Sequence, residues 1–437
     1  MDLFTPSTVR SAVERLLSAR LALRERTPAE IFSALDRTVG AWLEADSAWL
    51  RRAEAEVSRA SGFSPEMVRY ALPTVLAPLR APALERLVVE ELGGLEFLSR
   101  PPELPPRLVL HILPGNLPGL AAAPVCLSLA TGVAALLKPG SGDLAFPRLF
   151  LESLATLDPD LAACVEVRYW KGGSPEPEKE LFALVDAVDA AGSDEAMEDL
   201  AKRYSGTLVV RGSRLSFAYV ARPSWQDPLL RGRAFRALVE DTVVWDQLGC
   251  LSPQVVFFEG AAFGDLVRLA EELGEEFELA RKRLPPKRLS LEEESRIVRF
   301  RQEAEWREIR GEEKRLLGGE DLSWTLLLEK GPNFAPTCLH RTLRLQTVQG
   351  TEELEEPMRR AHSRLEAVGV AAAPDDFPAV ADVFRKARLP RVVPLGEMQR
   401  PGLDWKPGGI PRVREWFAPR DGEKSDRGTR VTPRALP

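Results

Sequence analysis

The chain has 437 residues, of which 44% are hydrophobic and 28% are charged, a composition typical of a soluble globular protein with two or three domains. Its formal net charge of −6 argues against a nucleic-acid-binding surface as the main function. The four cysteines are far apart, form no CxxC pair and stand beside only three histidines, which argues against a zinc site and favours a reducing compartment.

The first residues do not combine a basic start with an apolar segment, so we expect no signal peptide. No apolar run approaches the length of about 18 residues that a membrane span requires. The sequence therefore predicts a cytoplasmic protein without a membrane span.

Residues 1–95 predict a helical N-terminal region. Thr27 precedes a proline and is followed three residues later by Glu30, the pattern of a capping box at a helix start. Ser64 precedes a second Pro-Glu pair in the same way. These helices carry no residue pattern that indicates chemistry.

The pattern then changes to short apolar runs that alternate with helical stretches. The apolar runs predict strands buried on both faces, at 108–113, 133–137, 164–169 and 185–190. Strands that alternate with helices are typical of a parallel α/β sheet. Such sheets bind ligands beyond the carboxyl ends of their strands, where we expect the loops 114–119, 138–142 and 191–195.

A second α/β unit is expected to begin near residue 240. It is interrupted at about 265–320 by a stretch dense in charges of both signs, which predicts solvated helices rather than a partner site. Beyond about residue 400 the chain becomes rich in proline, glycine and arginine, and its end, 421–437, is predicted to be disordered.

Cys250 lies in a turn bounded by Gly249 and Pro253, between two apolar runs. A thiol in such a turn is well placed to face a cleft, and a thiolate attacks carbonyl carbons. The alternative is that Cys250, like most lone cysteines, is a small buried apolar residue. The turn alone does not decide between the two.

Asn116 lies in a loop directly after a predicted buried strand. Its amide is a donor that no change of pH removes, and with the backbone N–H of Cys250 it could hold the oxyanion formed when a thiolate attacks a carbonyl. The alternative is an asparagine that only closes a turn. Lys138, at the end of the next predicted strand, suits the ribose or phosphate of a nucleotide, or is an ordinary surface lysine.

Gly192 and Ser193 follow the fourth predicted strand and open a helix. Glycine permits close approach of a phosphate to a helix N-terminus, and serine is a natural N-cap. Asp194 and Glu195 oppose an anion there, so a plain capped helix is the alternative.

The order of these motifs resembles that of the aldehyde dehydrogenase superfamily. Within it, the stretches 111–119 (His-Ile-Leu-Pro-Gly-Asn-Leu-Pro-Gly) and 246–253 (Asp-Gln-Leu-Gly-Cys-Leu-Ser-Pro) resemble the LuxC-type acyl-CoA reductases, which make the long-chain aldehyde for bacterial luciferase. Shorter similarities lie at 194–196, 215–218, 338–342 and 394–398.

The resemblance implies an aldehyde-dehydrogenase-like α/β fold. A helical region (1–95) would precede a Rossmann-like nicotinamide-cofactor domain (96–240). A catalytic domain (241–400) and a C-terminal tail (401–437) would follow.

By the same resemblance, Cys250 would be the acyl-accepting nucleophile and Asn116 the oxyanion donor. Gly115, Lys138, Gly192 and Ser193 would line the site of the cofactor, NADPH or NADH. The substrate would be a fatty acyl-CoA. The implied partners are an acyl-transferring or acyl-activating enzyme and further copies of this chain.

The sequence departs from the superfamily pattern in two ways. The strand near 208–213 lacks the glutamate that activates water in hydrolytic aldehyde dehydrogenases, which suits a reductase, because activated water would release the acyl group as an acid. The Glu-Leu-Gly-Gly stretch at 91–94 lies too early in the chain and is expected to be a glycine-capped helix end. Ser213 and the stretch 405–409 also replace residues that are frequent in the family.

The sequence alone leaves two alternatives to an acyl-CoA reductase open. One is a reductase of another activated acyl group, either a carrier-protein thioester or an acyl phosphate. The other is a catalytically idle relative that serves as a binding or scaffold subunit.

Overall fold

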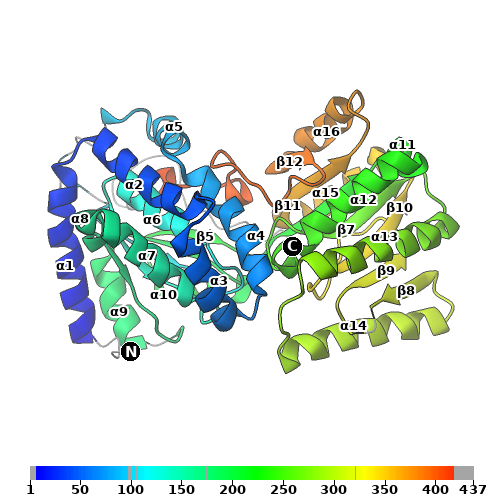
Figure 1. Cartoon of the computed structure of the whole chain (residues 1–437), viewed down its shortest axis with the longest axis horizontal. Helices are drawn as coiled ribbons and strands as arrows, with labels where there is room; N and C mark the ends of the chain where they lie inside the picture. The colour runs from blue at the N-terminus through cyan, green and yellow to red at the C-terminus, as the bar shows by residue number, and fades with distance from the viewer. Residues whose placement is uncertain are drawn as a thin grey trace. The chain divides into compact units, whose positions relative to one another are not determined.

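The computed structural model describes residues 6–417 except 97–100, 102, 105, 174 and 320. Among these residues the chain forms two compact units (Figure 1). Unit 1 contains residues 6–61, 68–213 and 402–417, and unit 2 contains 62–67 and 214–401. The predicted disordered tail, 421–437, lies outside the described residues.

The helices and strands up to residue 213 are, in chain order, α1 (Pro6–Arg24), α2 (Pro28–Leu43), α3 (Ala48–Ser61), α4 (Pro65–Leu76), η1 (Ala77–Leu79), α5 (Ala81–Leu92), β1 (Leu108–Ile112), α6 (Ala122–Ala130), β2 (Ala134–Lys138), α7 (Ala145–Leu157), α8 (Pro159–Ala163), β3 (Val165–Val167), α9 (Pro175–Leu184), β4 (Ala187–Ala191), α10 (Asp194–Arg203) and β5 (Thr207–Arg211).

The elements that follow are β6 (Leu215–Val220), α11 (Arg222–Gln226), α12 (Pro228–Val243), η3 (Val244–Gln247), β7 (Pro253–Glu259), α13 (Phe263–Arg283), α14 (Leu291–Ile309), β8 (Lys314–Gly318), β9 (Thr325–Glu329), β10 (Thr342–Val348), η4 (Thr351–Leu354), α15 (Glu355–Ala361), η5 (His362–Arg364), β11 (Leu365–Ala371), α16 (Phe377–Lys386), β12 (Arg391–Pro394), η6 (Pro407–Gly409) and η7 (Arg414–Phe417).

The N-terminal helices begin and end where their capping residues predict. The Thr27 hydroxyl accepts a hydrogen bond from the backbone N–H of Glu30, whose carboxylate accepts one from the Thr27 N–H, so α2 begins with a capping box. The helix α5 ends at Gly93, which adopts a left-handed conformation with φ 83°. The Glu-Leu-Gly-Gly stretch at 91–94 is therefore a helix end, as expected.

The first sheet is parallel and has the strand order β3-β2-β1-β4-β5. Its first four strands by sequence lie within two residues of the predicted apolar runs. The chain runs from β1 outward through β2 and β3, then returns to the other side of β1 for β4 and β5. The crevice where this direction reverses, between β1 and β4, is where parallel sheets of this kind bind ligands.

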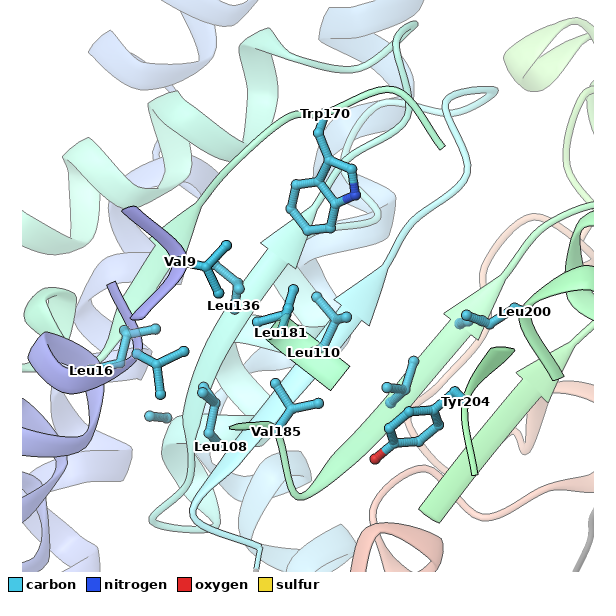
Figure 2. Packing of buried hydrophobic residues seen from close by; sticks show 14 of the residues in the cluster. Val9, Leu16, Leu108, Leu110, Leu136, Trp170, Leu181, Val185, Leu200 and Tyr204 are labelled. Carbon is cyan, nitrogen blue, oxygen red and sulfur yellow. The ribbon is translucent and has the colours of Figure 1, made fainter. Parts of the chain in front are cut away.

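One face of this sheet is covered by α1 and α9, as Figure 2 shows. Val9 and Leu16 of α1 pack with Leu108 and Leu110 of β1, all removed from solvent. This burial of apolar surface stabilises the sheet and fixes the strand ends from which the loops emerge. The helix α6 packs on β2, and α2 packs in turn on α6 and α7.

The second sheet has seven strands in the order β12-β11-β6-β7-β10-β9-β8. All neighbours are parallel except the edge strand β8, which runs antiparallel to β9. Its core is aromatic: Phe217 of β6 makes edge-to-face contacts with Phe257, Phe334 and Phe384.

The charge-dense stretch forms two helices, as its pattern predicts. The first, α13, is not simply solvated, because it buries one apolar face that includes Leu266, Leu269 and Phe277. The second, α14, is mostly solvent-exposed and buries only Ile297 and Ala304. None of the helices that the structure describes is long and apolar enough to cross a membrane.

The segment after residue 402 docks within unit 1. The Glu91 carboxylate accepts hydrogen bonds from the backbone N–H groups of Arg412, Val413 and Arg414. Trp416 donates to Asp189 on β4 at 2.9 Å. The glutamate of the 91–94 stretch therefore has a structural task, which is to hold this C-terminal segment.

Candidate active site

The loops after β1 and β2 contact each other backbone to backbone. A Cβ atom added to Gly140 would lie 2.3 Å from the nitrogen of Gly115, and one added to Gly142 would lie 2.2 Å from the oxygen of Gly115. Only glycine permits so close an approach. The structure thus brings the two predicted loops together and places Asn116, one residue later, on an exposed turn.

Asp143 strengthens the same junction. Its buried carboxylate faces the backbone N–H groups of Phe146 at the start of α7 and of Gly119 in the Asn116 loop, both of which act to lower its pKa. Burial raises the pKa of Asp143 to about 7. Sequence reasoning missed this residue, although an aspartate close to a helix start is a recognisable signal.

Lys138 ends β2 in a half-buried position beside this junction. Its ammonium lies 5.4 Å from the centre of the Trp170 ring. Burial lowers the pKa of Lys138, with an opposing effect from Glu178 and a further lowering by Arg203. Glu178 is itself engaged by Trp170 and Arg203, and among the described residues Lys138 forms no ion pair.

Gly192 and Ser193 follow β4, the neighbour of β1, so their loop and the Asn116 loop lie at the same edge of the sheet. The Ser193 hydroxyl accepts from the Ala196 N–H at 3.3 Å and caps α10, as predicted. Asp194 accepts from the Ser213 N–H at 2.7 Å, which ties this loop to the end of β5.

Cys250 is solvent-exposed, whereas Cys126 and Cys164 are buried and Cys338 is partly buried. Burial raises the pKa of Cys126 and of Cys164 to about 12, and it also raises the pKa of Cys338. Burial therefore favours the protonated, unreactive form of three of the four thiols. Cys250 is the cysteine that is exposed to solvent.

Two segments with strained backbone conformations adjoin the Cys250 turn. Residues 245–247 and residues 339–341 each consist of three consecutive non-glycine residues with positive φ, between 49° and 64°. Asp246 and Arg341 join the two segments through a buried ion pair, with the Arg341 Nε 2.5 Å from Asp246 Oδ1. Such backbone strain persists only where the surroundings enforce it, and it clusters at functional sites.

Gln247 joins the same two regions. Its amide nitrogen donates to the carbonyl oxygens of Pro253 and Thr342, each at 2.7 Å, and its oxygen accepts from the Thr342 N–H at 2.8 Å. The Gln247 amide thereby joins the two ends of the five-residue loop that carries Cys250 to each other and attaches the first end to the start of β10.

Two further side chains hold the loop between these ends. Ser216 on β6 donates to the carbonyl oxygen of Cys250 at 2.6 Å. Gln399 donates to the hydroxyl of Ser252 at 3.1 Å and to the carbonyl oxygen of Asp241 at 3.0 Å. The Asp241 carboxylate in turn accepts from the N–H groups of Gly396 and Met398.

The short stretches at 215–218, 338–342 and 394–398 thus meet around the Cys250 turn. These stretches are recognisable in the sequence, but their polar residues have no evident role there. The available signal was a polar side chain inside or beside a run that is otherwise apolar, such as Ser216 within a fully buried strand.

The structure also describes the two departures from the superfamily pattern. The strand β5 carries no glutamate, and its Arg211 pairs with Asp189 of β4. In the stretch 405–409, Trp405 lies under the guanidinium of Arg412, 5.4 Å from the ring centre. Among the described residues no cluster of His, Cys, Asp and Glu could hold a metal ion.

Cys250 belongs to unit 2, whereas the predicted residues Asn116, Gly115, Lys138, Gly192 and Ser193 all belong to unit 1. Within unit 1 the structure places its five residues at one edge of the sheet, Lys138 at the end of β2 and the other four on loops that follow β1 and β4. Within unit 2 it surrounds Cys250 with positioning contacts.

Comparison with solved structures shows an aldehyde-dehydrogenase-like fold, the α/β fold that the sequence predicted. An NADP-dependent glyceraldehyde-3-phosphate dehydrogenase from Bacillus halodurans, solved with NADP, matches with a TM-score of 0.67 at 16% identity, over 89% of this chain and 83% of that one. A putative methylmalonate-semialdehyde dehydrogenase from Sinorhizobium meliloti, solved with NAD, gives 0.65 at 15% identity, over 90% and 82%.

An aldehyde dehydrogenase from Bartonella henselae matches with a TM-score of 0.61 at 14% identity, over 90% of this chain and 84% of that one. No curated protein sequence matches this chain. The family model described as acyl-CoA reductase (LuxC) matches residues 24–410. The chain therefore belongs to the LuxC family of acyl-CoA reductases.

Proposed function

We propose that this protein reduces a fatty acyl-CoA thioester to the aldehyde, using NADPH or NADH, through an acyl-enzyme on Cys250. The observation that carries the proposal is the exposed thiol of Cys250 on a turn attached to its surroundings at several points, in a member of an acyl-CoA reductase family. A nucleophile that the fold holds in one position reacts faster, because less entropy is lost when it is oriented for attack.

The first half of the reaction exchanges one thioester for another. The Cys250 thiolate forms a bond to the thioester carbonyl carbon, and the carbonyl oxygen becomes an oxyanion. The intermediate collapses with cleavage of the bond between its central carbon and the coenzyme A sulfur. Coenzyme A leaves as its thiolate, which takes up a proton. The acyl group remains on Cys250.

The backbone N–H of Cys250 is the proposed donor to the oxyanion from unit 2, and the side-chain amide of Asn116 is the proposed donor from unit 1. Neutral donors that are already in place stabilise charge that develops during the reaction without a cost of reorganisation. Both groups are neutral at every pH at which the protein folds.

The loops of unit 1 fit a nicotinamide cofactor. The half-buried ammonium of Lys138, which forms no ion pair among the described residues, suits the ribose or phosphate of a nucleotide. Gly192 and Ser193 follow β4, which β1 separates from β2, and they lie at a helix N-terminus. The bound cofactor supplies the hydride that reduces the acyl group. Cys250 is then released as the thiolate when the aldehyde departs.

The absence of a glutamate from β5 supports reduction rather than hydrolysis. A base near the acyl-enzyme would activate water and divert the acyl group to the acid. The same feature suits a carrier-protein thioester or an acyl phosphate, so these donors are the second candidate substrates. An acyl-supplying partner enzyme and self-association are further proposals that follow from the family.

Steady-state oxidation of the reduced cofactor in the presence of each acyl donor tests the proposal. We expect acyl-CoA to support turnover by the wild type and the Cys250→Ala variant to be inactive. Cys126→Ala removes a fully buried thiol and serves as the matched control, which should retain activity. Turnover by Cys250→Ala at the wild-type rate would rule out the mechanism, and failure of every acyl donor would favour an idle scaffold.

A further inference from the structure

We propose that Ser216 and Gln247 are positioning residues that set the backbone geometry of Cys250 for acyl transfer. The inference rests on the proposed function, because it concerns the oxyanion that forms when Cys250 is acylated. Neither side chain touches the substrate in this account. Each acts through the main chain of the nucleophile.

Ser216 acts on the carbonyl of Cys250 itself. It is fully buried at 0% exposure on β6, between the strands β7 and β11. Its hydroxyl oxygen accepts from the Ala367 N–H at 3.1 Å, which leaves its single proton to donate to the Cys250 oxygen at 2.6 Å. The hydroxyl therefore has one hydrogen-bonding arrangement. It fixes the orientation of the peptide group between Cys250 and Leu251.

Gln247 acts on the chain that leads into the Cys250 turn, three residues before the nucleophile. Its three hydrogen bonds to Pro253 and Thr342 use both of its N–H donors and its oxygen. Gln247 also has positive φ (64°), a conformation that a non-glycine residue keeps only when it is held there. The chain therefore enters the Cys250 turn in a direction set by these bonds.

Together with the hydrogen bond from the Ser252 N–H to the Gly249 oxygen at 3.1 Å, which holds the peptide that carries the Cys250 N–H, the two anchors set the direction of that N–H. That direction does not matter for the simple reactivity of the thiol, since alkylation forms no oxyanion. It does matter for acylation, in which the N–H must lie within hydrogen-bond distance of the developing charge. Loss of an anchor should therefore slow acylation much more than it slows alkylation, whereas general damage to the fold would slow both.

The experiment compares Ser216→Ala with Ser153→Ala in the full-length protein. Ser153 is a matched control in unit 1: it is also 0% exposed, accepts from the Trp42 Nε1 at 2.8 Å and donates to the Phe150 oxygen at 2.7 Å. Each variant is mixed with a fatty acyl-CoA without cofactor, and the rate of acylation is followed by intact mass. The rate of Cys250 alkylation by iodoacetamide is measured in parallel.

For Ser216→Ala we expect acylation to slow by about ten- to a hundredfold, a cost typical of a displaced reacting group, while alkylation stays within about twofold of the wild type. Gln247→Glu, which loses both donated bonds, should behave likewise. Ser153→Ala should change neither rate. Ser216→Thr, which keeps the hydroxyl, should recover most of the acylation rate.

Acylation of Ser216→Ala at the wild-type rate would overturn the inference and leave the proposed function intact. A parallel fall of acylation and alkylation would also overturn it, because the role would then be structural. If the wild type is alkylated but accepts no acyl group, the proposed function fails and the inference fails with it.

Discussion

The residues of the site differ in what surrounds them, and these surroundings set their chemistry. Cys126 and Cys164 are buried thiols with pKa values of about 12, whereas Cys250 is exposed on a turn. Asn116 is exposed on a loop that packs closely against Gly140 and Gly142. Exposed polar residues on rigid loops are typical of function rather than of packing.

Asn116→Ala tests the proposed oxyanion donor. Removal of one such donor typically costs about a hundred- to a thousandfold in rate, so acylation of Cys250 should slow by roughly that factor. The free energy of unfolding should change by less than about 0.5 kcal/mol, because the side chain is exposed. Stopped-flow measurement of coenzyme A release gives the acylation rate, and denaturant titration gives the stability. An unchanged rate would remove Asn116 from the mechanism.

His111 predicts a dependence of stability on pH. Burial lowers the pKa of His111 from 6.5 to about 4; the charge of Asp189 opposes this effect, and the charge of Arg211 lowers the pKa further. A histidine whose folded pKa is depressed stabilises the fold above pH 6.5, and this contribution is lost as the pH falls toward 4. The loss at about pH 4 should be on the order of 3 kcal/mol.

His111→Gln is the matched variant, because it keeps a polar group near Ser128 but does not titrate. Urea titrations at neutral pH and near pH 4 should show that the wild type loses more stability than the variant over this interval. Equal losses in both proteins would show that His111 does not titrate as its burial predicts.

At the scale of elements, the Cys250 turn depends on two left-handed segments that are distant in sequence. The Asp246–Arg341 ion pair between them is buried on both sides, with 2% exposure of each side chain. Removal of one partner from a buried pair leaves an uncompensated charge, which typically costs about 3–5 kcal/mol.

Arg341→Met should therefore lower the free energy of unfolding by roughly 3–5 kcal/mol. Arg359→Met is the control, since the Arg359–Glu356 pair is solvent-exposed and its loss should leave the free energy of unfolding nearly unchanged. Denaturant unfolding of the three proteins measures both effects. Similar small losses in both variants would contradict the structural importance of the buried pair.

Much of the element order was predictable, because it depends on local patterns. Runs such as 108–113 are apolar on both faces, and only a strand in a covered parallel sheet suits that composition. The start of α2 and the end of α5 were predictable because the Thr27–Glu30 capping box and Gly93 are also local sequence patterns. The burial of one face of α13 was missed, because its many charges concealed the apolar face that includes Leu266 and Phe277.

The site was predictable only in its exposed parts. Cys250 and Asn116 lie in loops with recognisable neighbours, so the sequence identified them as candidates. The contacts of Ser216 and Gln247 depend on strand pairing between regions that are distant in sequence: Gln247 and Thr342 are 95 residues apart, and Ser216 and Ala367 are 151 apart. No local pattern encodes such pairing, and an isolated serine in an apolar strand has no assigned task until the fold is known.

At the scale of the whole molecule, the chain divides its candidate chemistry between two α/β units. Unit 1 carries the glycine-rich loops, Lys138 and Asn116, and unit 2 carries Cys250 with its anchors. The fold and the family were both accessible from the sequence, because the motifs kept their order along the chain. The substrate was not, since apolar residues that would line an acyl pocket are indistinguishable from core residues.

The central claim is that Cys250 carries the acyl group between the two halves of the reaction. Intact-protein mass spectrometry after incubation with a series of acyl-CoAs, followed by addition of NADPH or NADH, tests it most directly. We predict a mass increase of one acyl group that maps to Cys250, is absent from Cys250→Ala and disappears with formation of aldehyde when the reduced cofactor is added. An adduct that maps to another residue, or one that the cofactor does not discharge, would contradict the account.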